Sequence, residues 1–154
     1  MLKEKELRQL VSLLKKIEDP HKGLPQPIFD ALIKVVPFVA CELAITDKKG
    51  RLLLTWRDDK WWQGWHFPGG LFRFRESFRE RLEEVARREL GVGIKKYDFL
   101  FVKDCSQGRR GHVVDLVFRC ETTKTPKHGK FFNKMPKNII EDHKEFWKRI
   151  KKFK

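Results

Sequence analysis

The chain has 154 residues, 40% of them hydrophobic with five Trp and 13 Phe, which is enough for one domain with an apolar core and too short for two. No stretch approaches the roughly 18 apolar residues that a membrane helix needs. The opening MLKEKELRQL is charged from its third residue, unlike the core of a signal peptide. The three cysteines are odd in number and form no CxxC pair, which argues against a disulfide framework or a zinc site. We therefore expect no membrane partner and a cytoplasmic location, where thiols stay reduced.

The net charge of +14 raises the question of a nucleic-acid partner. Residues 121–154 contain ten Lys and one Arg against four acidic residues, so this tail alone carries +7. Its sequence IIEDHKEFWKRIKK predicts an amphipathic terminal helix that docks on the core and turns its lysines to solvent. We therefore favour solubility and docking for these lysines, expect no nucleic-acid partner, and keep RNA binding as an alternative to be tested.

The N-terminal part predicts two helices. Residues 2–18 carry an apolar stripe at helical spacing, formed by Leu7, Leu10, Val11, Leu14 and Ile17. Pro20 and Gly23 end this helix, and Ile28–Lys34 reads as one more short helix. Because one amphipathic helix cannot bury its stripe alone, we divide the chain into an N-terminal helical extension, residues 1–34, and a domain, residues 35–154.

From Val35 the apolar period changes to two, which predicts a strand with apolar residues on both faces. The residues DKKG at 47–50 are typical of a turn, and Arg51–Arg57 returns as a second strand. The two strands are expected to form a hairpin.

One helix is marked clearly at both ends. Ser77 and Glu80 have the spacing of a capping box, and Gly91 is placed to end the helix in a left-handed conformation. The predicted buried stripe is Phe78, Leu82, Val85, Ala86 and Leu90. The strands Tyr97–Lys103 and Val113–Cys120 follow as a second hairpin. This order predicts the α+β class, a mixed sheet between helices in an α/β/α sandwich.

Three features point to a site before any family is considered. Gly69 and Gly70 lack side chains, so the backbone there can approach a ligand closely and present its amide and carbonyl groups. Glu89 lies at the edge of the buried stripe, where a carboxylate is costly unless it is paired or holds a cation. Glu42 projects from an apolar strand, as a carboxylate does when it lines a cavity or meets a buried base. The residues alone leave structural alternatives open, namely a simple turn for the two glycines and an ion pair with Arg87 or Arg88 for Glu89.

The segment from Gly70 to Val92 resembles the Nudix box, G-x5-E-x7-R-E-U-x-E-E-x-G-U, in which U is an aliphatic residue. The positions that match are Gly70, Glu76, Ala86, Glu89, Gly91 and Val92. The preceding WHFPGG has the W-x-x-P-G-G form usual in the family. The resemblance extends from about Pro37 to about Trp147, and it implies the Nudix fold and a metal-dependent hydrolase.

The departures from the box concern metal binding. Glu84 and Val85 stand where the family pattern has Arg-Glu, and Arg88 stands where it has the first Glu of the final pair. Pyrophosphatases of this family usually gather several helix carboxylates around two or three magnesium ions. The reduced box therefore implies one Mg²⁺, or Mn²⁺, held by Glu89 and the Gly69 carbonyl together with water or phosphate oxygens.

The reduced box and residues 36–70 are similar to the GDP-mannose mannosyl hydrolase branch and its uncharacterised bacterial and archaeal relatives. An Asp on the first strand of that branch falls at Glu42 and an Arg on the second strand at Arg57, which implies that Glu42 orients or activates substrate and Arg57 binds phosphate. The Arg that follows the double glycine there is Leu71 here. The Gln-His pair near the C-terminus, metal ligand and base in that branch, has no clean match, and His128 is the nearest candidate for the base.

Further side chains are candidates for supporting roles. Trp61 and Trp62 could stack on a base or sugar, and Arg109 and Arg110 in the loop SQGRRG could contact phosphate. Buried loop aromatics and solvated arginines are the ordinary alternatives for these two pairs. Glu76 is expected to fix the loop before the helix without touching the ligand.

The sequence therefore predicts a Nudix-type hydrolase that acts on a nucleoside-diphosphate sugar or a related nucleoside diphosphate derivative, with cleavage at the sugar carbon favoured. Metal and arginine would neutralise the diphosphate and make it a competent leaving group. An ordinary pyrophosphohydrolase that splits the diphosphate is the alternative within the fold. A non-catalytic RNA-binding Nudix-like module is the alternative of another class. The base, the sugar and formation of a homodimer are left open.

Overall fold

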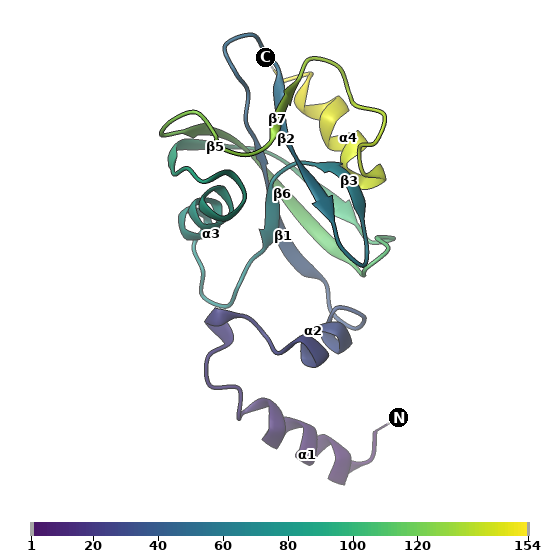
Figure 1. The fold of residues 1–154 in the computed structure, drawn as a ribbon. Coiled ribbons are helices and arrows are strands. Elements are labelled where there is room, and N and C mark those ends of the chain that lie inside the picture. The colour runs from purple at the N-terminus through teal and green to yellow at the C-terminus, as the bar shows by residue number, and fades with distance from the viewer. Residues whose placement is uncertain (1, 154) are drawn as a thin grey trace.

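The computed structural model describes residues 2–153, in which helices flank a core of strands (Figure 1). The strands are β1 (Phe38–Ala44), β2 (Leu52–Asp58), β3 (Gln63–His66), β4 (Gly69–Leu71), β5 (Ile94–Cys105), β6 (Val113–Thr122) and β7 (Lys130–Phe132). The helices are α1 (Glu4–Leu14), a 3-10 turn η1 (Pro20–Lys22), α2 (Gln26–Leu32), α3 (Phe78–Val85), a π-helical turn η2 (Ala86–Leu90) and α4 (Glu141–Ile150). Within residues 2–153 no helix has the length and apolar character needed to cross a membrane.

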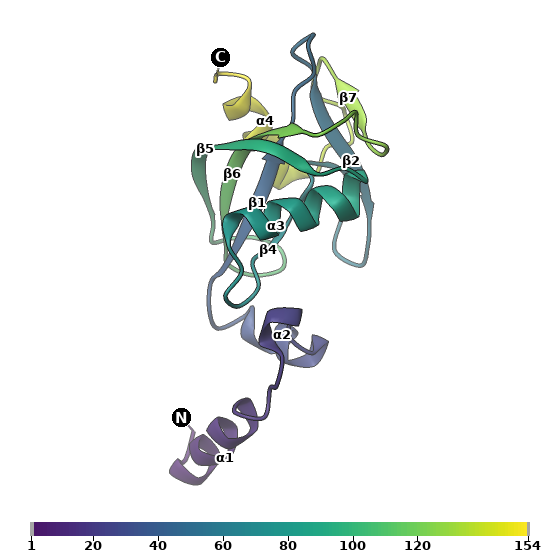
Figure 2. The ribbon, with the colours of Figure 1, turned by 90° about the vertical axis from the view of Figure 1, so that its left-hand side faces the viewer.

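The strands form two sheets. The larger has the order β4-β1-β6-β5, in which β1 and β6 run parallel and the outer pairs are antiparallel. The smaller has the order β3-β2-β7 and is antiparallel throughout. Helix α3 packs on one side of β1 and α4 on the other (Figure 2). The predicted α+β architecture with a mixed sheet between helices is confirmed.

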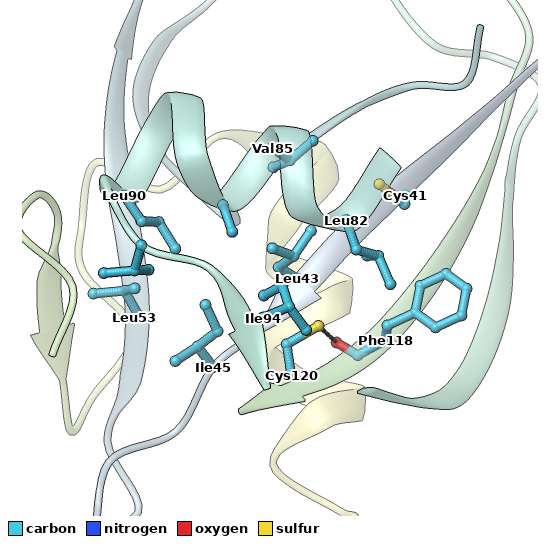
Figure 3. Packing of buried hydrophobic residues seen from close by; sticks show 12 residues of the cluster. Cys41, Leu43, Ile45, Leu53, Leu82, Val85, Leu90, Ile94, Phe118 and Cys120 are labelled. Atoms are coloured by element: carbon cyan, nitrogen blue, oxygen red, sulfur yellow. Dashed lines mark hydrogen bonds between the residues drawn. The ribbon is translucent and has the colours of Figure 1, made fainter. Parts of the chain in front are cut away.

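The alternation of β1 explains how one strand serves both layers. Cys41 and Leu43 point into a cluster with the apolar residues of α3 (Figure 3). Ala44 belongs to a second cluster, with Phe146 of α4. Because successive side chains of a strand face opposite sides of a sheet, apolar residues at both parities give this two-sided burial. Glu42 has the parity of Ala44 and therefore faces the side of α4.

The first predicted hairpin forms only at its turn. The Asp47 Oδ1 accepts hydrogen bonds from the backbone N–H groups of Lys49 at 3.0 Å and Arg51 at 2.9 Å, and a single bridge joins Thr46 to Leu52. Beyond that bridge the strands separate, since β1 pairs with β4 and β6 whereas β2 pairs with β3 and β7. The prediction of a continuous hairpin was wrong because sequence-distant strands compete for the same edges. Two of these competitors, β4 and β7, have three residues each and gave no periodic signal.

The second predicted hairpin is confirmed, because β5 and β6 pair antiparallel along their length. Its strands are longer than the sequence pattern indicated. In the parallel pair that β6 makes with β1, Asp115 lies opposite Ala40. The β6 carboxylate therefore lies in the same part of the sheet as Glu42.

Helix α3 begins where the capping box predicts. The Ser77 Oγ accepts from the backbone N–H of Glu80 at 3.3 Å, and the Glu80 carboxylate accepts from the backbone N–H of Ser77 at 2.8 Å. The buried residues of the predicted stripe are Leu82, Val85, Ala86 and Leu90. Phe78 is half exposed, in contrast to the prediction, because it lies in the first turn of α3. Its ring packs edge-on against Phe72. The helix ends at Gly91, whose φ of 66° is left-handed as predicted.

The residues that precede β1 lie at one end of the molecule (Figure 1). Helix α2 packs on the domain through Phe29, whose ring meets Phe38 edge-on with centroids 5.4 Å apart. Helix α1 contains no buried residue, and in both views it projects away from the sheets (Figure 2). This arrangement is compatible with a division of the chain near residue 34, which stays a proposal.

Candidate functional site

A cavity of about 1060 Å³ is lined by residues from β1, β2, β4, β6, η2 and α4. Its size suits a ligand as large as a nucleotide or somewhat larger. The residues proposed from the sequence that line it are Glu42, Arg57, Trp62, Gly69, Glu89 and Arg110. The two sheets thus bring residues that are up to 68 positions apart in the sequence together around one cavity.

The remaining proposed site residues lie outside the cavity lining. The Arg109 Nη1 donates to the Trp61 carbonyl oxygen at 2.9 Å, which ties two loops together. His128 is exposed in the loop between β6 and β7. The Glu76 Oε2 accepts from the backbone N–H of Arg73 at 2.9 Å, and this contact closes the loop before α3. We therefore do not retain His128 as the base.

Glu42 is a deeply buried acid of the cavity, with 8% of its surface exposed. Its Oε2 is buried and has no hydrogen-bond partner among the described residues. Burial, together with the nearby carboxyls of Asp115 and Glu89, holds the pKa of Glu42 well above its usual range. An orphaned carboxylate oxygen at a cavity wall is a group that a ligand or a water molecule would satisfy.

Asp115 is a second buried acid in the cavity. The Cys105 Sγ donates to the Asp115 Oδ2 at 3.1 Å. The Lys103 Nζ lies 3.2 Å from the same sulfur and donates to the Asp142 carbonyl oxygen at 3.1 Å. Burial raises the pKa of Asp115, and burial beside Asp115 raises the pKa of Cys105 to about 12. The thiol therefore stays protonated and acts as a hydrogen-bond donor.

Two buried histidines complete this wall of the cavity. The His143 Nδ1 accepts from the backbone N–H of Phe67 at 3.2 Å and lies 3.9 Å from the Glu42 Oε2. Accepting at Nδ1 leaves the proton of the neutral ring on Nε2. Burial lowers the pKa of His143 well below its ordinary value and that of His66 to about 4, so both rings are neutral near pH 7.

Glu89 lines the cavity and belongs to the π-helical turn η2. Its Oε2 accepts from the Thr55 hydroxyl at 3.2 Å and lies 3.7 Å from the His66 Nε2. Its Oε1 accepts from the Arg88 Nη2 at 3.0 Å. Burial raises the pKa of Glu89, and the hydrogen bond from Arg88 opposes that rise. Both carboxylate oxygens thus have protein partners.

Arg88 binds three acceptors at the rim. Its Nη2 donates to the Gly69 carbonyl oxygen at 3.2 Å as well as to Glu89, and its Nη1 donates to the Glu84 Oε2 at 2.9 Å. Glu84 also pairs with the buried Arg81, which donates to the Leu71 carbonyl oxygen at 3.0 Å. The guanidinium of Arg88 therefore occupies the space between the two atoms expected to bind a metal.

A cationic wall faces these groups. The Arg57 guanidinium lies 4.9 Å from the Trp62 ring centroid, and the Arg110 guanidinium lies 5.3 Å from the same centroid. The Arg57 Nε donates to the Asp59 Oδ2 at 2.6 Å. The Arg110 Nε is buried and has no hydrogen-bond partner among residues 2–153. One aromatic ring thus holds two arginines at the same cavity, an arrangement suited to an anion.

Comparison with known proteins identifies the family of the chain. Residues 37–150 match the NUDIX domain. The chain belongs to the Nudix family. The low-salt glycan biosynthesis protein Agl8 of Haloferax volcanii is 32% identical over 78 residues, and the match covers 50% of this chain and 49% of Agl8. This Nudix chain therefore aligns with about half of the length of that relative.

Solved structures agree with the Nudix fold. The MutT NUDIX hydrolase from Burkholderia pseudomallei superposes with a TM-score of 0.65 at 21% identity, covering 75% of this chain and 98% of that one. The NUDIX domain of Shewanella oneidensis NrtR, solved with ADP ribose, superposes with a TM-score of 0.59 at 15% identity, covering 84% and 98% of the two chains. At these identities the likeness concerns the fold.

Nudix hydrolases generally use divalent metal ions, and such an ion needs several oxygen ligands. Within residues 2–153 no group of three or more His, Cys, Asp or Glu side chains is arranged to hold a metal. The two expected ligands, Glu89 and the Gly69 carbonyl, are close together but both accept from Arg88. A divalent ion about 4 Å from that guanidinium would be repelled by about 8 kcal/mol at an effective dielectric constant of about 20. The residues in this arrangement do not fit a resident magnesium ion.

Several residues of the site escaped the sequence analysis. Asp115 interrupts an apolar strand in the same way as Glu42, and that signal could have found it. His143 falls at helical spacing with Phe146 and Trp147, which are buried with it on the inner side of α4. The sequence marks Arg88 as a departure from the box and as one of two possible ion-pair partners of Glu89, but not as a partner of Gly69. Its contacts depend on the backbone at Gly69, nineteen positions away, which no local pattern reveals.

Proposed function

We propose that the cavity hydrolyses a nucleoside-diphosphate sugar or a related nucleoside diphosphate derivative. The observation that carries this proposal is the presence, in one cavity, of the wall formed by Arg57, Trp62 and Arg110 and of the buried Glu42 with its orphaned oxygen. The wall offers positive charge for a diphosphate and the acid offers a site for water. Membership of the Nudix family and the ADP ribose bound to the NrtR domain support the same ligand class.

The arginines are proposed to neutralise the diphosphate. Guanidinium groups match phosphate oxygens with paired N–H donors, and both Arg57 and Arg110 line the cavity. A neutralised nucleoside diphosphate is a better leaving group because less charge accumulates when its bond to the sugar breaks. Trp62 makes cation–π contacts with both arginines, and its ring lines the cavity, where it provides apolar surface for a base or sugar.

Glu42 is proposed as the general base. In its ionised form it accepts a proton from water while the water oxygen forms a bond to the sugar carbon and the bond from carbon to the diphosphate oxygen breaks. A carboxylate with a raised pKa is a stronger base than an ordinary one. The acceptor nitrogen of the neutral His143 ring, Nδ1, already accepts from the backbone N–H of Phe67, which leaves Glu42 as the candidate for the base.

Cleavage at the sugar carbon is favoured over cleavage at phosphorus. Attack on phosphorus by the usual route needs a cluster of metal ions that activates water and neutralises the reacting phosphoryl group. The described residues present arginines at this place, and no cluster of three or more acidic or histidine side chains suited to a metal is found among them. Arginines are sufficient for a departing diphosphate, whereas they do not activate water.

Hydrolysis of GDP-mannose and GDP-glucose in oxygen-18 water tests the proposal. We expect labelled free sugar and unlabelled GDP. Labelled GMP or sugar phosphate would show attack on phosphorus and establish the pyrophosphohydrolase alternative. If neither substrate, nor ADP-ribose as a third, is consumed with or without added magnesium, the proposed hydrolase function is wrong.

The setting of the reaction is also proposed. We place the protein in the cytoplasm, in keeping with three cysteines that are all unpaired, two of them buried. A small-molecule nucleoside diphosphate derivative is the proposed partner. Formation of a homodimer, which the sequence leaves open, is not part of the proposal.

A further inference from the structure

Arg88 stands at the centre of the atoms that the Nudix box would offer to a metal ion. Its Nη2 lies 3.2 Å from the Gly69 carbonyl oxygen and 3.0 Å from the Glu89 Oε1. Its Nη1 lies 2.9 Å from the Glu84 Oε2. Three oxygen atoms from β4, α3 and η2 thus surround one guanidinium, as oxygen ligands surround a cation.

Gly70 leaves space for the Arg88 guanidinium because it has no side chain. A Cβ at Gly70 would lie 3.4 Å from the Arg88 Nη2 and 3.3 Å from Val85, so the side chain packs directly on a glycine. Val85 stands where the family pattern has a carboxylate, and its apolar side chain offers no ligand to a metal. Val85 and Arg88 replace the two missing carboxylates of the box, and both side chains lie next to Gly70.

The charge is fixed in position and still accessible. Glu84 accepts a hydrogen bond from Arg88 and is itself paired with the buried Arg81, so the guanidinium belongs to a network of charged side chains. The Arg88 side chain is nevertheless 44% exposed and lines the cavity. The Arg88 guanidinium is bound to Glu84 and is also exposed at the cavity, so it can contact an anion that enters there.

We propose that the Arg88 guanidinium takes the place of the divalent metal ion, so that this Nudix chain binds the diphosphate through a built-in cation and needs no metal there. The assignment of a diphosphate as the ligand rests on the proposed function. The exclusion of the metal does not, because it follows from the occupation of Gly69 and Glu89 by Arg88. A permanent charge of this kind cannot be removed by a chelator.

Manganese binding provides the direct test, read from the loss of the free Mn²⁺ signal in electron paramagnetic resonance and independent of turnover. We expect the unmodified chain to leave the signal unchanged up to about millimolar metal. The variant Arg88→Glu should gain a site, because it exchanges the competing cation for a second carboxylate beside Glu89 and the Gly69 carbonyl. The double variant Arg88→Glu with Glu89→Gln should lose that site again.

Arg87→Glu is the matched control for charge. It makes the same change one residue earlier, on a side chain that is 75% exposed and does not line the cavity. It should bind no manganese. Circular dichroism at 222 nm checks that each variant is folded, and Arg88→Gln repeats the loss of the cation without adding a negative charge next to Glu84.

Pyrophosphate serves as the probe for the anion, titrated calorimetrically in the presence of EDTA. We expect binding to the unmodified chain, a loss of about tenfold or more in Arg88→Gln, and little change in Arg87→Gln. Binding that appears only when magnesium replaces EDTA overturns the proposal. So does a Glu89-dependent manganese site in the unmodified chain, or the absence of any gain in Arg88→Glu. If pyrophosphate binds under neither condition, the proposed function fails, and the manganese titration still decides the role of Arg88.

Discussion

The carboxyl group of Glu42 lies directly against Gly69, so that a Cβ at position 69 would be 2.5 Å from Oε2 and 2.6 Å from Oε1. The two residues are register partners in the antiparallel pair of β1 and β4. Gly69 does not have a positive φ, so its backbone conformation does not require glycine. The glycine is needed for space, because only hydrogen at this position admits the acid.

Gly69→Ala should therefore displace Glu42 and impair turnover. Contacts near 2.5 Å must be relieved by movement of a buried side chain, for which overpacking costs of about 1–3 kcal/mol in unfolding free energy are typical. Urea unfolding and initial rates with GDP-mannose measure the two effects. Gly93→Ala is the control, since its Cβ would meet neighbours at 3.4 Å or more, in ordinary contact. Full activity of Gly69→Ala would mean that the position of Glu42 does not matter.

Glu42→Gln should stabilise the protein at high pH while abolishing the proposed base. Because burial and neighbouring carboxyls hold the pKa of Glu42 above that of the unfolded chain, the folded state binds the proton more tightly. Stability of the unmodified protein then falls as the pH rises from about 4.5 to the folded pKa. Glutamine does not titrate, so its advantage is small near pH 4.5 and largest above the folded pKa. Turnover should fall by about 100-fold or more.

Thermal unfolding at pH 5 and pH 8 measures this difference. Glu121→Gln, an exposed position on β6 outside the cavity, removes the same charge and should show no such increase with pH. A Glu42→Gln protein that is less stable than its parent by the same amount at both pH values would contradict the raised pKa. One that is more stable yet fully active would place the base elsewhere.

Much of the fold was predictable because it depends on local signals. The capping box at Ser77, the left-handed Gly91 and the alternation of β1 each act over a few residues, and each is confirmed. The separation of β1 and β2 into two sheets was not predictable in this way. It depends on which distant strand competes best for each edge, and β4 and β7 are too short to show a period of two.

The candidate site was likewise predictable only where a residue gives a local signal. Glu42 and Glu89 stood out because a carboxylate among apolar residues needs an explanation, and both line the cavity. The sequence indicates His128 only by its place near the C-terminus, and in the structure this residue lies on an exposed loop. His143 was hidden because its helical spacing with apolar neighbours is also that of a core residue. Only the packing of α4 on Phe67 shows that it borders the cavity.

The basic C-terminal segment should not bind RNA. Its helix docks through an apolar face, and several of its cations already have intramolecular roles. Arg149 lies 3.8 Å from the Phe101 ring centroid, and the Lys151 Nζ donates to the Gly50 carbonyl oxygen at 2.6 Å. Fluorescence anisotropy with single-stranded RNA at about 50 mM and 200 mM salt measures this. Binding at low salt that weakens steeply with added salt, through counterion release, would restore the RNA alternative.

Arg57→Ala should weaken catalysis by removing a phosphate contact from the cationic wall. Loss of a charge-assisted hydrogen bond costs about 1.5–3 kcal/mol, which corresponds to a fall of about 10- to 150-fold in kcat/KM. Arg57 also stabilises the position of Trp62, so part of the effect should appear as a higher KM for every diphosphate substrate. Steady-state kinetics with two substrates of different base measure the loss.

Arg51→Ala is the matched control for Arg57. Arg51 immediately precedes the same strand, bonds Asp47 at 2.7 Å and does not line the cavity, so its loss should leave KM and kcat close to those of the parent. A fall in kcat as well as a rise in KM for Arg57→Ala would indicate that the guanidinium meets charge that develops on the departing diphosphate. A rise in KM alone would indicate equal binding of ground and transition states. Unchanged kinetics would mean that the face of β2 carrying Arg57 is not where the diphosphate binds, and the proposed orientation of the substrate across the cavity would be wrong.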